Sequence, residues 1–216
     1  FGVAILYSTL GLMLAFIIAI IFVNLKFSYR ALMLLFIFTT AFTLSFFYSG
    51  LPIFERVAIM LDGAINFFSM YKLEDVRYVD FGDFVKLQGG SNDVSMFFRL
   101  KHWTEIIYIM STDWFLLIPG WGMSTSVNLT SLALVPHNDW LRVLFELGII
   151  NFIAFGLLSY NIYRKLKNVS KQLVIIFLTI NIYFFSENLI NNFLITSFLY
   201  FISGLVIHFE NFKYRA

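Results

Sequence analysis

Apolar residues occur in long runs along this chain, separated by short polar segments, and the lengths of these runs predict membrane-spanning helices. A helix needs about 20 predominantly apolar residues to cross the hydrocarbon core of a bilayer. Five segments have this length or nearly so, and the fourth is the shortest: 1–23, 31–48, 140–163, 172–187 and 192–209. The expected fold class is therefore an all-α polytopic membrane protein.

The basic residues predict which side of the membrane the short connections face. Segments after the first span, after the third span and at the C-terminus hold eight of the 15 Lys and Arg residues but, with Glu210, only one of the 13 Asp and Glu residues. The eight are Lys26, Arg30, Arg164, Lys165, Lys167, Lys171, Lys213 and Arg215. Because short cytoplasmic loops are enriched in Lys and Arg, we expect these segments to be cytoplasmic.

The predicted organisation has three parts: two spans in 1–48, a large extracytoplasmic loop in 49–139, and three spans with a short cytoplasmic tail in 140–216. Within the loop, helical spacing of apolar residues predicts a helix lying in the membrane interface over 51–71. A second helix should begin near 91, run through 110 and stop at Pro119 and Gly120. The charged segment between the two helices is expected to be a solvated lobe. The chain opens inside an apolar run without Met, so we expect it to be part of a longer protein.

Composition supports the assignment to a membrane. The chain is 60% hydrophobic and 13% charged, with a mean hydropathy of +0.82, values far from those of soluble domains. Its 28 Phe, 11 Tyr and 4 Trp residues suit lipid-facing and interfacial positions. The chain has no Cys, which excludes disulfides and thiol chemistry, and its net charge of +2 is too small to indicate nucleic acid binding.

Polar residues gather at the predicted start of the third span, in the stretch PHND. Pro136 is expected in the first turn of that helix, which places His137, Asn138 and Asp139 around the helix N-terminus, with Asp139 as its cap. The free N–H groups and the dipole at this end attract anions and favour a neutral imidazole that can accept a proton. His137 is therefore a candidate acid–base residue.

Two arginines are candidates for binding substrate. Arg99 shares a helix face with Trp103, and a guanidinium binds phosphate oxygens bidentately, so Arg99 is a candidate anion clamp with a snorkelling interfacial arginine as the alternative. His102 lies beside Arg99 and is a candidate substrate-binding residue. The alternative is a surface or interfacial histidine. Arg142 precedes Glu146 by one helical turn, and the alternative to substrate binding is an interfacial ion pair with that glutamate.

An acidic cluster raises the question of a metal site. Hard cations bind carboxylates, and four occur close together in the loop: Glu74, Asp75, Asp80 and Asp83. Their spacing fits no ion-binding loop. We therefore expect a solvated acidic surface and no bound metal.

Several motifs resemble the O-antigen ligase and O-antigen polymerase superfamily of bacterial envelope glycosyltransferases. Those proteins carry a large periplasmic loop that ends in His, then Asn, Ser or Gln, nine residues, Gly, two residues, and Gly, Thr or Tyr. Here His137, Asn138 and Gly148 match this pattern, whereas Asn151 departs from it. The segments FRLKHW (98–103), PGWGMS (119–124), ELGII (146–150) and 184–205 are also similar to the family. The resemblance covers roughly 96–205, about half of the chain.

The resemblance implies a GT-C-like helical bundle in the bacterial inner membrane, with its active site facing the periplasm. It implies glycosyl transfer without metal or cofactor, in which an acceptor hydroxyl attacks a saccharide carried on undecaprenyl diphosphate and inverts the anomeric carbon. Arg99 would stabilise the departing diphosphate, and His137 would act on the acceptor hydroxyl or the diphosphate. The implied partners are the undecaprenyl-diphosphate-linked oligosaccharide, membrane lipid and a chain-length regulator protein, and no nucleic acid.

The remaining candidates follow from the same resemblance. Asn138 and Asp139 would orient His137 or the sugar. Trp103, Trp121 and Trp140 are candidates to stack on a sugar face, with membrane anchoring as the alternative.

Four functions are weighed on this basis. A polymerase uses a second lipid-linked repeat unit as acceptor and a ligase uses the lipid A core; the departures at Trp103 and Asn151 from the ligase pattern favour a polymerase, with a ligase as the alternative. A lipid-linked sugar transporter or flippase would need ionisable or helix-breaking residues near mid-membrane, and the predicted spans contain no Pro and keep their charges at the ends. The motif match disfavours a non-catalytic scaffold.

Overall fold

The computed structural model describes residues 10–24, 33, 37, 40, 52–87, 95–190 and 193–213. All regular secondary structure in these residues is helical, which confirms the all-α part of the predicted fold class. The chain forms two compact units: unit 1 consists of Phe1–Asn24 with Ile109–Ala216, and unit 2 of Leu25–Tyr108. The loop predicted over 49–139 is therefore divided, because its last third belongs with the C-terminal helices.

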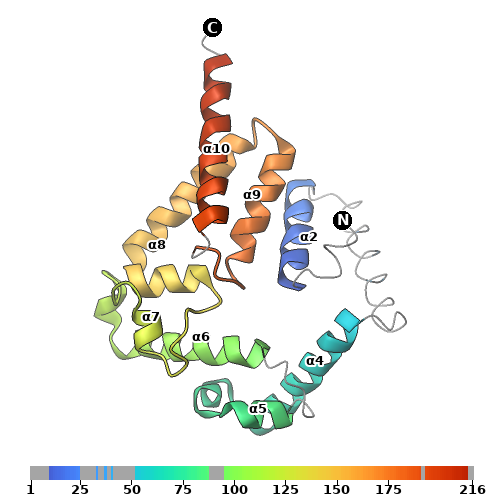
Figure 1. Ribbon diagram of the computed structural model, residues 1–216, viewed down its shortest axis with the longest axis vertical. Coiled ribbons are helices and arrows are strands. Elements are labelled where there is room, and N and C mark those ends of the chain that lie inside the picture. Colours follow the sequence, from blue (N-terminus) through green and yellow to red (C-terminus); the bar gives the residue numbers. More distant parts are fainter. Residues whose placement is uncertain are drawn as a thin grey trace. The chain divides into compact units, whose positions relative to one another are not determined.

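The described residues of unit 1 form four longer helices and two short ones. The longer helices are α2 (Leu10–Asn24), α8 (Asp139–Leu166), α9 (Lys171–Tyr183) and α10 (Phe193–Lys213), and the short ones are the 3-10 helix η2 (Trp114–Leu117) and α7 (Thr125–Asn128). Figure 1 shows α9 between α2 on one side and the α8–α10 pair on the other. Helices therefore occur where the first, third, fourth and fifth spans were predicted.

Helix length supports fewer spans than the sequence predicts. Among the described residues, α8 alone is long and apolar enough to cross a membrane. With 13 residues, α9 extends only about 20 Å of the roughly 30 Å that a bilayer core requires. Its predicted continuation to residue 187 is wrong, because the chain turns after Tyr183. The second predicted span, 31–48, lies almost entirely outside the described residues, so the polytopic arrangement is not supported by these helices.

Small residues bring α2 close to α9. Gly11, Ala15 and Ala19 are spaced by four residues and so lie on one face of α2, where both alanines are buried. A Cβ at Gly11 would lie 2.9 Å from the Ser186 hydroxyl and 3.1 Å from the Tyr183 ring. Small residues at this spacing allow two helix backbones to approach closely, which is how helices commonly associate within membranes.

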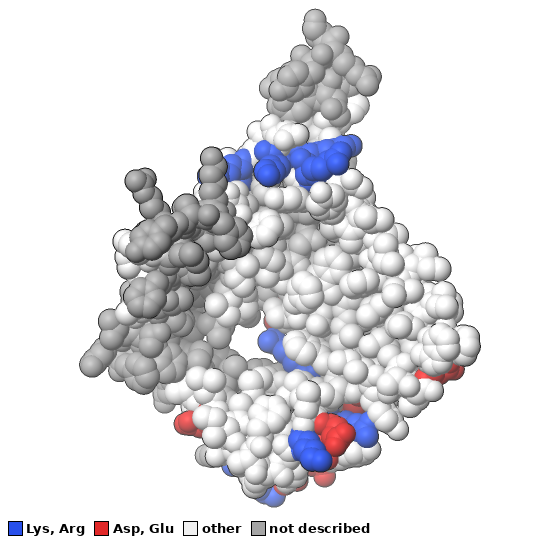
Figure 2. All heavy atoms as spheres, turned by 180° about the vertical axis from the view of Figure 1, so that it is seen from behind, with Lys and Arg blue, Asp and Glu red and all other residues white. Residues whose placement is uncertain are grey.

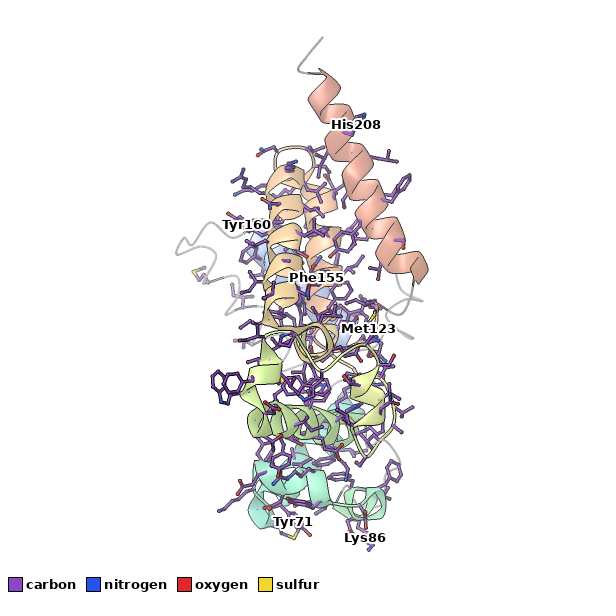
Figure 3. All side chains as sticks on the ribbon, turned by 90° about the vertical axis from the view of Figure 1, so that its left-hand side faces the viewer. Tyr71, Lys86, Met123, Phe155, Tyr160 and His208 are labelled. Atoms are coloured by element: carbon purple, nitrogen blue, oxygen red, sulfur yellow. The ribbon has the colours of Figure 1, made fainter. Side chains whose placement is uncertain are left out.

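The end of α8, the first half of α9 and the adjacent part of α10 enclose an aliphatic and aromatic core. Leu166, Val174, Phe177 and Leu199 are its buried members. Nearer the middle of α8, Phe155 packs against Trp140, Phe184 and Tyr200 (Figure 3). The interior of this unit is therefore continuous from the α8–α9 connection to the start of α8.

The outer surface of unit 1 is apolar along the helices and basic at one end. Leu14, Ile18 and Phe22 on α2, and Ile150, Ile153 and Leu157 on α8, are between 45% and 64% exposed. Arg164, Lys165, Lys167 and Lys171, around the connection from α8 to α9, are exposed. Figure 2 shows Lys and Arg side chains gathered in a band beside a wide uncharged surface. Large apolar side chains exposed in such numbers mark contact with lipid or another protein.

Unit 2 contains the two helices predicted in the loop. These are α4 (Pro52–Met70) and α6 (Ser95–Thr112), and between them lie the 3-10 helix η1 (Leu73–Tyr78) and α5 (Phe81–Leu87). The segment between the helices, predicted to be a solvated lobe, exposes Glu74, Asp80 and Lys86, and η1 and α5 also contribute buried side chains to a core. That core consists of Phe67, Val76, Val79, Phe84 and Phe97, with the rings of Phe84 and Phe97 stacked 4.8 Å apart.

Helix α8 is interrupted at Gly148, whose φ of 79° and ψ of 173° are not helical. The loop that follows η2 lies against this interruption. The backbone N–H groups of Trp121 and Gly122 donate to the carbonyls of Phe145 and Glu146, each at 3.0 Å. Backbone acceptors next to a helix interruption need such partners when they are removed from water.

The loop approaches the interruption through two glycines. Gly120 and Gly148 both have positive φ, a conformation that side chains other than glycine's rarely adopt. A Cβ on Gly120 would collide with backbone atoms of Glu146, Leu147 and Gly148, and a Cβ on Gly148 would collide with backbone atoms of the loop. The segments PGWG (119–122) and ELG (146–148) are thus in direct contact.

We expect Gly148→Ala to destabilise unit 1 by about 2 kcal/mol or more, because the new Cβ meets fixed backbone in an unfavourable φ. Gly156→Ala is the matched control in the same helix, where a Cβ meets nothing within 4 Å and alanine favours the helix. Thermal unfolding of the purified variants, followed by tryptophan fluorescence, measures both. Equal melting temperatures for the two variants would contradict the tight contact at Gly148.

Candidate active site

The N-terminus of α8 is capped by Asn138. Its side-chain oxygen accepts a hydrogen bond of 2.9 Å from the backbone N–H of Leu141. The expectation that Asp139 caps the helix is therefore wrong, as is the expected place of Pro136 in the first turn, since the helix begins only at Asp139. Asn138 acts on the helix backbone rather than on His137.

The start of α8 is joined to the segment that follows α9. The backbone N–H of Asp139 donates to the Phe184 carbonyl at 2.7 Å, and the Asp139 carboxylate accepts from the Ile190 N–H at 2.8 Å. The indole N–H of Trp140 donates to the Asn181 carbonyl at 3.0 Å. Residues some 40 to 50 positions apart are thereby held together at this end of unit 1.

Asp139 is fully buried, with an exposed fraction of 0%. One carboxylate oxygen is bonded to Ile190, and the other has no hydrogen-bond partner among the described residues. The opposite charges of Arg142 and Glu187 both act on this carboxylate. Burying a carboxylate oxygen without a donor costs free energy, and such groups in native proteins often have a functional reason.

His137 lies beside Glu187, which is the main residue that the sequence interpretation missed. The imidazole Nδ1 is 3.2 Å from the Glu187 carboxylate, and the two side chains are 35% and 19% exposed. The available signal was that Glu187 is the only charged residue between Lys171 and Glu210. A single acid within such an apolar stretch indicates a functional site by default.

The His137–Glu187 pair has the geometry of an oriented base. In the tautomer with its proton on Nδ1, the imidazole donates to the carboxylate, and Nε2 carries the lone pair that can accept a proton. The carboxylate fixes the ring orientation and stabilises the imidazolium that forms on protonation. The pair can therefore accept a proton from a bound hydroxyl and later release it.

Arg142 and Glu146 form the predicted ion pair, but inside the protein rather than at an exposed interface. The Arg142 Nε is 3.0 Å from one Glu146 oxygen, and the two side chains are 15% and 4% exposed. The hydroxyl of Ser126, a buried residue on α7, donates to the other Glu146 oxygen. Ser126 was also missed, because nothing in the sequence places the four-residue α7 beside α8.

The two candidate tryptophans of unit 1, Trp121 and Trp140, pack against other aromatic rings. Trp121 stacks on Phe145, with ring centroids 4.9 Å apart. Trp140 contacts Phe152, Phe155 and Phe185. These contacts give both indoles a packing role, and stacking on a sugar stays a prediction.

Three other candidates belong to unit 2, whereas the cluster around His137 consists of unit 1 residues. Arg99 is partly buried on α6. His102 is fully buried and meets Phe98 edge-on at 6.4 Å, so the alternative of a surface histidine is wrong. Trp103 is partly buried, and its indole nitrogen has no hydrogen-bond partner among the described residues.

Two of the four acidic loop residues have local structural roles. The Asp75 carboxylate accepts from the Lys72 N–H at 2.7 Å at the start of η1. The Asp83 carboxylate accepts from Lys86 at 2.9 Å, and this hydrogen bond and the negative charge raise the pKa of Lys86. In the part of the chain that the structure describes, no three His, Cys, Asp or Glu residues are grouped so that they could hold a metal ion.

Comparisons with known proteins identify no relative. No family model matches the chain, and neither a curated protein nor a solved structure matches it significantly. The interpretation of the site therefore depends on the residues themselves.

We expect Glu146→Ala to destabilise unit 1 by roughly 3–5 kcal/mol, because it leaves the buried Arg142 guanidinium without its carboxylate. Replacing both residues by leucine should cost less than Glu146→Ala alone, since no guanidinium is then left without the Glu146 carboxylate. Thermal or denaturant unfolding of the purified variants measures the difference. A change below about 1 kcal/mol for Glu146→Ala would mean that the pair behaves as an exposed one.

Proposed function

We propose that the chain is a bacterial inner-membrane glycosyltransferase that polymerises O-antigen or a related surface polysaccharide at the periplasmic face. Its donor would be a repeat unit on undecaprenyl diphosphate and its acceptor a hydroxyl of a second lipid-linked unit. The observation that carries the proposal is the His137–Glu187 pair, with Nδ1 3.2 Å from the carboxylate at the capped start of α8. This pair supplies the base that attack by a hydroxyl requires.

Two features of unit 1 favour a membrane location. One is α8, which is long and apolar enough to span a bilayer; the other is the exposed apolar surface of α2 and α8. The exposed basic residues around the α8–α9 connection would then face the cytoplasm. On this orientation His137, at the opposite end of α8, faces the periplasm. This orientation requires only that α8 crosses the bilayer, and the further spans are proposed from the sequence pattern.

The proposed chemistry is a single displacement. Nε2 of His137 accepts the proton of the acceptor hydroxyl while the oxygen forms its bond to the anomeric carbon. The bond from that carbon to the phosphate oxygen breaks, and undecaprenyl diphosphate leaves with the electron pair. Inversion follows from attack opposite the leaving group, and Arg99 is proposed to stabilise the charge on the diphosphate.

The charges around His137 favour the acceptor over the diphosphate as its target. Glu187 contacts the imidazole, and the buried carboxylate of Asp139, two positions along the chain, interacts with the charges of Arg142 and Glu187. A surplus of carboxylates repels a second anion and suits a neutral hydroxyl that donates a hydrogen bond. This is why we assign the diphosphate to Arg99 and the proton to His137.

We expect His137→Ala to lower transfer at least about 100-fold, because it removes the base. Glu187→Gln should lower it roughly 10- to 100-fold, because the orienting carboxylate becomes a neutral amide. Glycan assembled by cells carrying each variant at equal protein level measures the loss. Glu74→Gln, at an exposed glutamate of unit 2, is the control for the same chemical change.

A near-normal amount of polymer from His137→Ala or Glu187→Gln would contradict the role proposed for the substituted residue. Repeat units that fail to reach the periplasmic face in these variants would indicate a flippase. Arg99→Ala in the same assay tests the diphosphate assignment independently of the base.

The lipopolysaccharide of a strain lacking the gene should show a single repeat unit on the core, because a polymerase elongates the glycan before its transfer. The gel ladder of extracted lipopolysaccharide measures this. A bare core with long polymer left on the carrier lipid would contradict polymerisation and indicate the ligase reaction.

A further inference from the structure

Helix α4 exposes a line of large apolar side chains. Leu61, Ile65 and Phe68 are 53%, 67% and 52% exposed. Their spacing of four and three residues places them on one face of the helix, over a length of about 10 Å. We call these three residues the α4 stripe.

On one side of the stripe α4 contributes to the core of unit 2, and on the other side it carries exposed polar residues. Phe67 is fully buried and packs against Phe84 and Phe97 in the core of unit 2. Asp62 and Ser69 lie on the opposite side of the stripe and are exposed. The helix thus has one face for the core, one for water and a narrow apolar face between them.

We propose that the α4 stripe lies in the headgroup boundary of a lipid bilayer, with α4 parallel to the membrane surface. An amphipathic helix at this depth buries its apolar side chains and keeps its polar side wet, as the arrangement around the stripe requires. The inference rests on the membrane location in the proposed function and adds which three side chains of unit 2 contact lipid.

The size of the stripe favours lipid over a second protein. Three side chains that are half to two-thirds exposed offer on the order of 300 Å². A stable protein interface takes about 800 Å² from each partner. A bilayer surface has no such requirement when the helix is already tethered. Unit 2 is covalently joined at both ends to unit 1, which carries α8 and the exposed apolar surface of α2.

The absence of cysteine from the sequence makes the test direct. Ile65→Cys and Phe68→Cys place single nitroxide labels on the stripe of the full chain, reconstituted in nanodiscs of phosphatidylethanolamine and phosphatidylglycerol. Asp62→Cys and Ser69→Cys are matched controls on the water-facing side of the same helix. Power saturation by oxygen, which partitions into lipid, and by a water-soluble nickel chelate measures the surroundings of each label.

We expect labels at 65 and 68 to be more accessible to oxygen than to nickel, and labels at 62 and 69 to show the reverse. Equal preference for nickel at all four positions would overturn the inference, as would labels at 65 and 68 that are immobilised and shielded from both reagents. The latter result would indicate a protein partner. Leu157→Cys on α8 separates the two proposals: a water-exposed label there contradicts the membrane location itself, whereas a lipid-exposed one leaves only the α4 stripe in question.

Discussion

Unit 1 depends on supplying hydrogen-bond partners to the polar groups at the start of an apolar helix and at its interruption. Asn138 caps the first turn of α8, Phe184 and Ile190 bond Asp139, and Trp121 and Gly122 bond the carbonyls before Gly148. Leaving such groups unpaired away from water would cost a large share of the stability that packing provides. These bonds also fix the ends of α8 and α9 and the loop after η2 against one another.

The same bonds place the candidate catalytic groups. Once Trp140 is bonded to the last turn of α9 and Asp139 to the segment after it, His137 and Glu187 lie close together although 50 positions separate them in the chain. The buried Ser126–Glu146–Arg142 group holds α7 against the same half of α8. Packing and hydrogen bonds of this kind restrict the position of a base, so that it can accept a proton from a bound hydroxyl in a fixed geometry.

Sequence periodicity located most of the helices but did not predict which residues they pack against or where α9 ends. The helices α4, α6 and α8 occur where apolar spacing predicts them, because local propensity and an apolar face suffice to form a helix. The core that the charged segment between α4 and α6 contributes to was not predicted, because Val76, Val79 and Phe84 are isolated apolar residues without a clear period. Their burial depends on Phe67 and Phe97. The fourth predicted span was too long for a related reason. Phe184 and Phe185 continue the apolar run, yet the chain turns after Tyr183, and the Phe184 carbonyl accepts from the Asp139 N–H at the start of α8.

The sequence by itself determined the all-α class, the Arg142–Glu146 pairing one helical turn apart and the position of His137 beside the start of a helix, because each is a local property of the chain. It also placed Gly120 and Gly148 in two motifs, but it did not show that the two motifs are in contact. Only the tertiary structure decided the partners: Glu187 for His137, Ile190 for Asp139, Ser126 for Glu146. It likewise decided which apolar residues of α4 are used in a core and which are left exposed. Such pairings depend on how the chain returns to itself over tens of residues, and no local pattern encodes that path.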